Sequence, residues 1–141
     1  MPATKLDHVN IRTRQPEATR DFFVDVVGLR DGERPPFNFN GYWLYAGEQA
    51  VIHLTDARDK SANGTADGSG GAAVDHVSFR MTGYSALRAL LRDRNLPHAT
   101  RVVPRNGDVQ IFVDDPNGVT VELTFLGSEV SAEEKAQLVP R

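Results

Sequence analysis

One seven-residue pattern occurs twice in this chain, and it constrains the fold more than any other feature. Residues 6–12 read Leu-Asp-His-Val-Asn-Ile-Arg, and residues 74–80 read Val-Asp-His-Val-Ser-Phe-Arg. The two histidines, His8 and His76, are 68 positions apart (76 − 8) in a chain of 141 residues. A repeat at about half the chain length predicts two copies of one supersecondary unit.

Each copy of the pattern has the alternation of a half-buried β-strand. Polar and apolar residues follow one another after the aspartate, which is the period of a strand with one face in the core. Side chains two positions apart share a face of a strand, so His8 lies on the same face as Asn10 and Arg12. The second copy places His76 and Ser78 on the equivalent face. Both halves are therefore predicted to present a polar face that begins with a histidine.

The bulk composition is that of a soluble globular domain and excludes several functions. Apolar residues make up 40% of the chain and charged residues 25%, which are ordinary values. The net charge of −3 and the lack of a basic run argue against nucleic acid as a partner. Without cysteine there is no disulfide and no thiolate metal site. We expect no membrane association and a cytoplasmic location, because neither a signal segment nor a long apolar stretch is present.

The first half of the chain reads as strand, helix and three strands. A helix is predicted over residues 17–27, because Pro16 suits its first turn and Gly28 its end. Apolar and aromatic runs, separated by Pro, Gly and Asn, predict the strands of this half over residues 6–12, 29–34, 42–46 and 50–55.

The second half repeats this order. A helix is predicted over residues 84–95, and a capping box at residues 131–134 predicts a short helix at the end of the chain. The predicted strands of this half cover residues 74–80, 98–103, 109–113 and 119–125. The fold class is therefore α+β, with two βαβββ modules in one domain of residues 1–141. The predicted parts are module 1 (5–56), a Gly-rich linker (57–73), module 2 (74–126) and a C-terminal tail with a helix (127–141).

Four side chains that can bind a metal fall at matching places in the two halves. His8 and His76 begin the two modules, and His53 and Glu122 lie on their last strands, 69 positions apart (122 − 53). Three imidazoles and one carboxylate suit Zn²⁺, Fe²⁺, Ni²⁺, Co²⁺ or Mn²⁺. A single histidine on a strand is more often structural than a ligand, but four matched positions favour one divalent metal.

With these motifs the chain resembles the vicinal oxygen chelate superfamily, which includes glyoxalase I, methylmalonyl-CoA epimerase, bleomycin-resistance proteins and extradiol dioxygenases. The resemblance rests on the two Asp-His-Val motifs and on residues 112–123, Phe-Val-Asp-Asp-Pro-Asn-Gly-Val-Thr-Val-Glu-Leu. It implies two modules that form a U-shaped mixed sheet around a metal, with His8, His76 and Glu122 at ligand positions. His53 stands where bacterial glyoxalase I has a glutamate and the epimerase has a glutamine. It is therefore predicted to be a fourth ligand or an acid–base group.

The resemblance implies a metal-dependent, glyoxalase-like lyase or isomerase. Its substrate would be a small molecule that chelates the metal through vicinal oxygens, with His53 and Glu122 as catalytic groups. One alternative is an extradiol-type dioxygenase with Fe²⁺, which needs only two histidines and one carboxylate. A further alternative is a bleomycin-resistance-like binding protein. The family also implies a homodimer.

Candidate substrate-binding residues surround the predicted ligands. Arg12 and Arg80 follow the two histidines on the same strand face, where they are predicted to receive a carboxylate or phosphate of the substrate. Ion pairing with neighbouring carboxylates is the alternative for both. Arg105 lies in a predicted turn and is a candidate for a lid. Trp43 and Phe37 are candidates for the wall of an apolar pocket, with core packing as the alternative for the strand residue Trp43.

Overall fold

The computed structural model describes residues 1, 3, 5–59 and 74–138. The chain divides into two compact units, Met1–Gly70 and Gly71–Arg141, and each unit is described by itself. The linker is predicted at residues 57–73, and its residues 60–73 lie outside the described residues.

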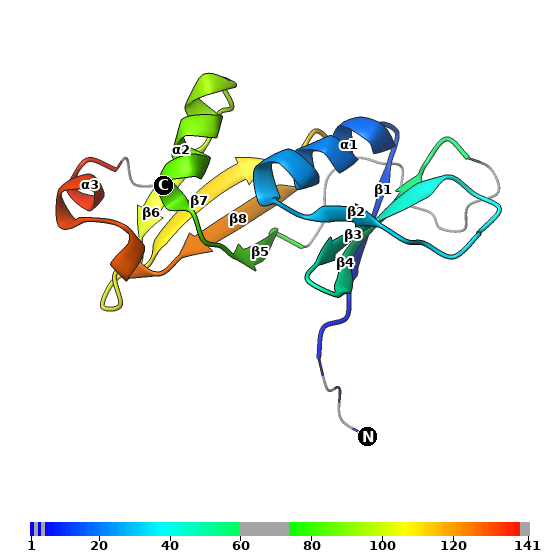
Figure 1. Cartoon of the computed structure of the whole chain (residues 1–141), viewed down its shortest axis with the longest axis horizontal. Helices are drawn as coiled ribbons and strands as arrows, with labels where there is room; N and C mark the ends of the chain where they lie inside the picture. Colours follow the sequence, from blue (N-terminus) through cyan, green and yellow to red (C-terminus); the bar gives the residue numbers. More distant parts are fainter. Residues whose placement is uncertain (2, 4, 60–73, 139–141) are drawn as a thin grey trace. The chain divides into compact units, whose positions relative to one another are not determined.

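The first unit is a four-stranded mixed sheet with one helical segment (Figure 1). Its strand order is β1-β4-β3-β2, in which β1 is parallel to β4 and the other pairs are antiparallel. The elements are β1 (Val9–Thr13), α1 (Pro16–Phe22), the π-helical η1 (Phe23–Val27), β2 (Arg30–Gly32), β3 (Gly41–Ala46) and β4 (Gln49–Asp56).

The second unit repeats this topology. Its strand order is β5-β8-β7-β6, and β5 is parallel to β8. The elements are β5 (His76–Arg80), α2 (Tyr84–Asp93), β6 (Ala99–Val102), β7 (Val109–Asp114), β8 (Thr120–Phe125), the 3₁₀ turn η2 (Gly127–Glu129) and α3 (Ala132–Ala136). The α+β class and the two βαβββ modules are therefore confirmed.

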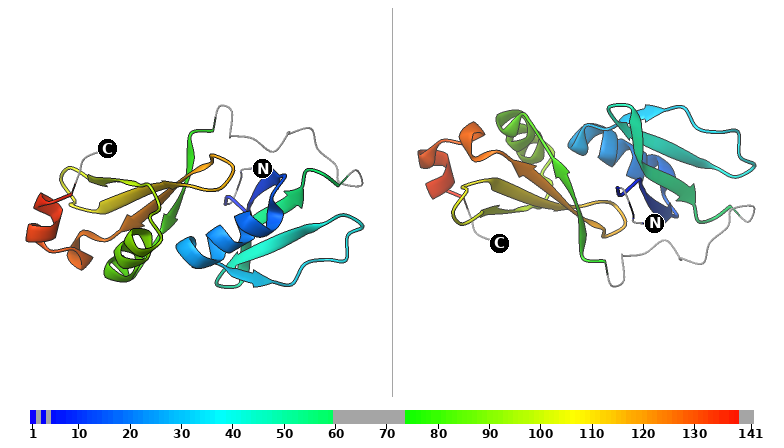
Figure 2. Two further views of the ribbon diagram at one scale, coloured as in Figure 1. Left: turned by 90° about the horizontal axis from the view of Figure 1, so that it is seen from above. Right: turned by 90° about the horizontal axis from the view of Figure 1, so that it is seen from below.

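In each unit the helix lies on one face of its own sheet (Figure 2). Buried apolar side chains of the helix and the sheet form the core of the unit. Phe23, which is fully buried, lies in the helical segment of the first unit, and Leu44 and Ile52 are buried in its sheet. In the second unit the Tyr84 ring of α2 meets the Phe125 ring of β8 edge-on, with centroids 5.4 Å apart. His53 alternates with the buried Ile52 and Leu54 along β4, so its side chain lies on the other sheet face.

Local sequence explains where the first helical segment begins and ends. Pro16 occupies the first turn of α1 and is buried, where the missing N–H of proline costs nothing. The segment continues through η1 and ends at Gly28, which has φ of 83°. A residue without a Cβ favours this left-handed conformation.

The register of the two sheets places the proposed ligands at equivalent positions. Asn10 of β1 pairs with His53 of β4, and Ser78 of β5 pairs with Glu122 of β8. Asn10 and Ser78 each lie two residues after the histidine of their own motif. The repeat in sequence is therefore also a repeat in hydrogen-bond register.

Several predicted boundaries differ from the structure by one to three residues. The first strand was predicted from residue 6 but begins at Val9, because the preceding residues are solvent-exposed and Leu6 is 81% exposed. The strand predicted at 29–34 is limited to Arg30–Gly32, before the two prolines at 35 and 36. The predicted C-terminal helix is present as α3, with Ser131 accepting a hydrogen bond from the Glu134 amide at 3.1 Å.

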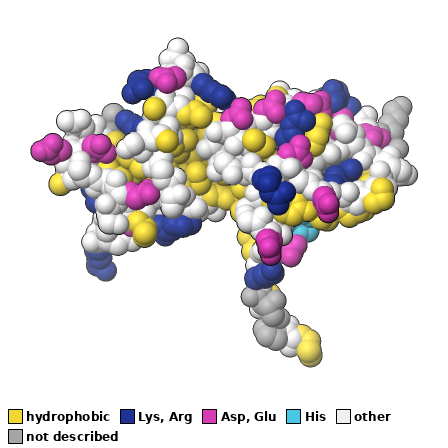
Figure 3. Space-filling view, in the orientation of Figure 1, with side chains coloured by type: hydrophobic (Ala, Val, Ile, Leu, Met, Phe, Trp, Pro, Cys, Tyr) yellow, Lys and Arg dark blue, Asp and Glu magenta, His cyan; other side chains and the backbone are white. Residues whose placement is uncertain are grey.

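Apolar and charged side chains share the face drawn in Figure 3. On this face, acidic and basic side chains are interspersed in both units. No helix in the described part of the chain is long and apolar enough to cross a membrane.

Candidate metal-binding residues

In the second unit, one nitrogen of His76 faces one oxygen of Glu122. The Nε2 atom of His76 lies 3.7 Å from Oε1 of Glu122. Two donors at about 2.1 Å from a tetrahedral metal lie about 3.4 Å apart, so this separation is close to that of two ligands of one ion. The His76 side chain is 36% exposed and that of Glu122 only 9%. The imidazole is accessible, while the carboxylate is held within the sheet.

Two hydroxyl groups hold the other oxygen of Glu122. The Ser78 hydroxyl donates a short hydrogen bond to Oε2, and the Thr124 hydroxyl donates to the same oxygen at 3.2 Å. Ser78 lies directly across the parallel pair from Glu122, which explains why its side chain reaches the carboxylate. Because both hydroxyls use Oε2, Oε1 is the oxygen directed towards His76.

In both units an aspartate orients the histidine that follows it. Nδ1 of His8 donates to Oδ2 of Asp7 at 2.8 Å, and Nδ1 of His76 donates to Oδ2 of Asp75 at 2.7 Å. A carboxylate accepts only, so in the neutral ring each hydrogen bond places the proton on Nδ1 and leaves the lone pair on Nε2. This arrangement is typical of histidines that bind a metal through Nε2.

In the first unit, His53 is sandwiched between two aromatic rings. Its ring centroid lies 3.7 Å from that of His8 and 4.0 Å from that of Trp43, with interplanar angles of 11° in both cases. Burial lowers the pKa of His53 below its ordinary value, and the neighbouring His8 lowers it further. His53 is therefore favoured in its neutral form, which is the form that binds a metal or accepts a proton.

The donor chemistry of both pairs fits a divalent transition metal. The donors of these pairs are three imidazoles and one carboxylate: His8 with His53, and His76 with Glu122. In His8, His76 and Glu122, a hydrogen bond to a second polar atom of the side chain fixes its orientation. Within the described residues, no group of three or more His, Asp or Glu side chains lies close enough to hold a metal. The donors are thus present as one pair in each unit.

The structure places the predicted arginines in different environments. Nη1 of Arg80 donates to Oδ2 of Asp108 at 3.2 Å, so this arginine is in an ion pair. Arg12 is half-buried on β1 opposite Thr55. Arg105 is exposed in the turn between β6 and β7 and has φ of 75°.

One arginine beside the Glu122 carboxylate was missed by the sequence reasoning. Nη2 of Arg101 lies 4.0 Å from Oε1 of Glu122, and its guanidinium lies 5.4 Å from the centroid of the Phe112 ring. The Phe112 ring in turn meets His76 edge-on, with centroids 6.3 Å apart. Alternation of polar and apolar residues along β6 indicates which strand face carries Arg101. It does not indicate that β6 pairs with β7, and this pairing brings Arg101 close to Glu122.

Aromatic side chains extend from His53 into the loop before β3. Phe37 stacks on Phe39, with centroids 5.0 Å apart, and lies 6.4 Å from Trp43. The Arg34 guanidinium lies over both phenylalanine rings, at 5.1 and 4.9 Å from their centroids. Phe37 is 45% exposed. These rings form a partly exposed aromatic surface in the first unit.

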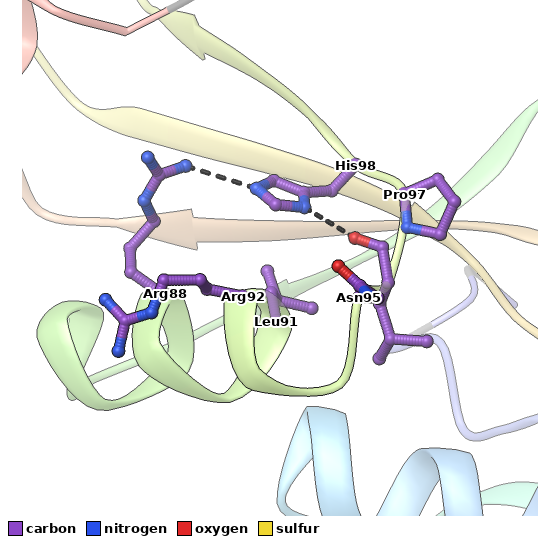
Figure 4. A pocket seen from close by; sticks show the side chains of 7 residues that line it. Arg88, Leu91, Arg92, Asn95, Pro97 and His98 are labelled. Carbon is purple, nitrogen blue, oxygen red and sulfur yellow. Dashed lines mark hydrogen bonds between the residues drawn. The ribbon is translucent and has the colours of Figure 1, made fainter.

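The fourth histidine, His98, has structural contacts. Its Nδ1 donates to the Leu96 carbonyl at 2.8 Å, and its Nε2 accepts from Nη1 of Arg88 at 3.2 Å (Figure 4). It contributes to an open pocket of about 520 Å³ at the end of α2, which also includes Arg92 and Pro97. His98 is thus tied to α2 and to the turn that follows it.

Comparisons with solved structures identify the fold. A lactoylglutathione lyase from Agrobacterium tumefaciens is 19% identical, with a TM-score of 0.61 over 89% of this chain and 96% of the other. TnmS3, an antibiotic-binding protein from Streptomyces sp. CB03234, is 18% identical, with a TM-score of 0.62 over 89% and 98%. A glyoxalase family protein from Enterococcus faecalis is 25% identical, with a TM-score of 0.54 over 85% and 96%.

No curated protein matches the chain. The sequence itself matches a family over most of its length, at residues 5–123. This range contains both Asp-His-Val motifs and Glu122. The chain belongs to the Glyoxalase/Bleomycin resistance protein/Dioxygenase superfamily.

Proposed function

We propose that this protein is a divalent-metal-dependent lyase or isomerase that acts on a small substrate with two vicinal oxygens. His8, His53, His76 and Glu122 are the proposed metal ligands. The observation that supports the proposal most is the pair in the second unit, where Nε2 of His76 and Oε1 of Glu122 face one another at 3.7 Å. Their remaining polar atoms are occupied by Asp75 and by two hydroxyls.

When bound, the metal would supply Lewis-acid stabilisation of charge on the chelated substrate oxygens. The chain itself supplies the acid–base groups. When it is not bound to the metal, His53 is the proposed proton acceptor, because its lowered pKa keeps a lone pair available near neutral pH. Glu122 is the second proposed catalytic group, and Ser78 and Thr124 fix its orientation. Trp43 and Phe37 are proposed to exclude water from an apolar part of the substrate, and Arg12, Arg80 and Arg105 remain candidates for its anionic part.

Proton exchange next to a chelating carbonyl tests this activity. Hydroxyacetone carries a hydroxyl and a carbonyl on neighbouring carbons and is small enough to serve as a probe. Protein loaded with Ni²⁺, Zn²⁺ or Mn²⁺ is expected to catalyse deuterium uptake into hydroxyacetone in D₂O, followed by NMR. Chelator-treated protein is the control and should be inactive. No uptake with any of these metals would contradict the lyase or isomerase assignment.

The same preparation tests the dioxygenase alternative. Oxygen consumption with Fe²⁺ and catechol, together with the absence of deuterium uptake, would favour ring cleavage with His8, His76 and Glu122 as the three ligands. In that case His53 would serve as the acid–base group only.

A second candidate function is the binding of an aromatic compound without chemistry. The stacked Phe37 and Phe39 rings, close to Trp43 and covered by Arg34, favour a flat aromatic ligand. The antibiotic-binding protein among the structural neighbours has the same fold. Saturable quenching of Trp43 fluorescence by an aromatic antibiotic, unchanged by chelator, would support binding alone. Trp43 is the only tryptophan of the chain, so the signal reports this surface directly.

A further inference from the structure

Arg101 makes its close side-chain hydrogen bonds to an uncharged group, whereas several other arginines of the described chain lie against aspartates. Arg58, Arg80 and Arg92 each lie within 3.2 Å of an aspartate oxygen. Arg101 instead donates two hydrogen bonds to the amide oxygen of Gln110, one from Nε at 2.8 Å and one from Nη2. An amide oxygen carries no net charge, so it fixes the guanidinium without neutralising it.

The carboxylate near Arg101 is the proposed metal ligand. Oε1 of Glu122 lies 4.0 Å from Nη2, which is beyond hydrogen-bonding distance. In the proposed site this carboxylate shares its charge with a metal cation. The guanidinium of Arg101 then lies beside the ligand carboxylate as a cation that an anionic group can still approach.

The Arg101 side chain is also held in place before any ligand arrives. Gln110 lies directly across the β6–β7 pair from Arg101, and the guanidinium lies over the Phe112 ring. About half of the side chain, 49%, remains exposed. A cation that is fixed but accessible loses little conformational freedom on binding, so more of its interaction energy contributes to affinity.

We infer that Arg101 binds an anionic group of the substrate, a carboxylate or phosphate, next to the oxygens that are presented at Glu122. The inference rests on the proposed function. It narrows the substrate to a small acid with two features: a vicinal oxygen pair and a further anionic group one or two carbons away. Arginine suits this role because its planar fork pairs with two oxygens of such a group.

Malate and lactate are a matched pair of probes for this subsite. Both carry a carboxylate and a hydroxyl on neighbouring carbons, and malate adds a second carboxylate. Each is titrated by calorimetry into the full-length protein loaded with Ni²⁺, and the affinity for Ni²⁺ alone is measured separately. The wild type is expected to bind malate about 10- to 100-fold more tightly than lactate, the range of a charge-assisted hydrogen bond.

The variants separate substrate binding from support of the sheet. Arg101→Gln should bind both acids with similar affinity and keep its affinity for Ni²⁺, and Arg101→Lys should restore part of the preference because it keeps the charge without the fork. Arg92→Gln makes the same charge change on an exposed residue of α2 and should behave as wild type.

Each other outcome overturns the inference in a recognisable way. Ni²⁺ binding with an unchanged malate preference in Arg101→Gln would remove Arg101 from the substrate site and leave the proposed function standing. Loss of Ni²⁺ binding in this variant would show that Arg101 supports Glu122 rather than the substrate. Failure of the wild type to bind Ni²⁺ or any other divalent metal would remove the proposed function, and this inference with it.

Discussion

At the scale of single residues, the Asp-His pair is the unit that the two halves share most closely. Each aspartate holds the Nδ1–H of the next histidine, at 2.8 Å in the first unit and 2.7 Å in the second. The hydrogen bond from His8 also lowers the pKa of Asp7. The aspartates thus decide which ring nitrogen carries the proton and which is free to bind a metal.

Removal of one aspartate should therefore weaken metal binding without removing a ligand. Asp75→Ala is expected to lower the affinity for Ni²⁺ or Zn²⁺ by about 10- to 100-fold, measured by calorimetry. Asp75→Asn should lose less, because its amide oxygen still accepts from Nδ1. Asp93→Ala is the control, since Asp93 is similarly exposed and pairs with Arg92. Equal affinities in Asp75→Ala and Asp93→Ala would contradict the positioning role of Asp75.

A buried carboxylate in the first unit gives the molecule a predicted acid sensitivity. Hydrogen bonds from the Arg58 side chain, at 2.8 and 2.9 Å, hold the pKa of Asp56 well below its usual value. The unfolded chain therefore binds more protons than the folded chain below about pH 4. The stability that Asp56 contributes is present above that pH and is lost as the pH falls towards its folded pKa.

Urea unfolding at several pH values tests this contribution. Asp56→Asn should cost about 1–3 kcal/mol at pH 7, and the difference from wild type should shrink as the pH falls below about 4. Glu48→Gln, in the exposed turn between β3 and β4, is the control and should change little. A difference between Asp56→Asn and wild type that stays constant down to pH 2 would exclude the ion pair as its cause.

At the scale of elements, two glycines are required for different reasons, one for its backbone conformation and one for the lack of space for a Cβ. Gly28 needs its left-handed φ of 83°, but a Cβ there would meet nothing within 4 Å. A Cβ at Gly41, at the start of β3, would lie 2.1 Å from the backbone oxygen of Leu54. Gly41 pairs with Thr55 of β4, so the close approach is part of the β3–β4 register.

Alanine substitution should separate these two demands. Gly28→Ala is expected to cost about 1–2 kcal/mol, the penalty of a left-handed L-residue. Gly41→Ala must move backbone away from the strand that carries His53, so we expect a larger loss and a weaker His53–Trp43 stack. Thermal unfolding and Trp43 fluorescence measure both effects. A Gly41→Ala protein as stable as Gly28→Ala would show that β3 and β4 do not approach as closely as described.

Much of this element order could be predicted because it follows from local patterns. Alternation around His8 and His76, the helix between Pro16 and Gly28, and the capping box at Ser131 all depend on near neighbours in sequence. The matched positions of His53 and Glu122 followed from the repeat. Their register partners, Asn10 and Ser78, agree with that match.

The remainder of the site depends on contacts between distant segments. Arg101 reaches Glu122 only because β6 pairs with β7 and β7 with β8. Arg80 has Asp108 as its partner, 28 positions away, and neither residue alone indicates the pair. The ends of the strands also differ from the prediction, because solvent exposure at Leu6 rather than alternation decides where β1 begins.

At the scale of the whole molecule, the chain is two versions of one module with unequal donors. The first unit brings two imidazoles close together, and the second brings an imidazole and a carboxylate. The homodimer stays a prediction, which light scattering on the purified protein tests. A metal that used donors from both units would also stabilise the folded chain, by about 2.7 kcal/mol at a concentration 100 times its dissociation constant.

The proposed function requires that His8 and His53 of the first unit bind the same metal as His76 and Glu122 of the second. The direct measurement is metal content by elemental analysis, for untagged protein purified without chelator and supplemented with Ni²⁺, Zn²⁺, Mn²⁺ or Fe²⁺. We predict about one metal per chain in the wild type, and strong loss in His8→Ala of the first unit and equally in His76→Ala of the second. Full metal content in either variant, or no metal in the wild type, would contradict a metal site with ligands from both units.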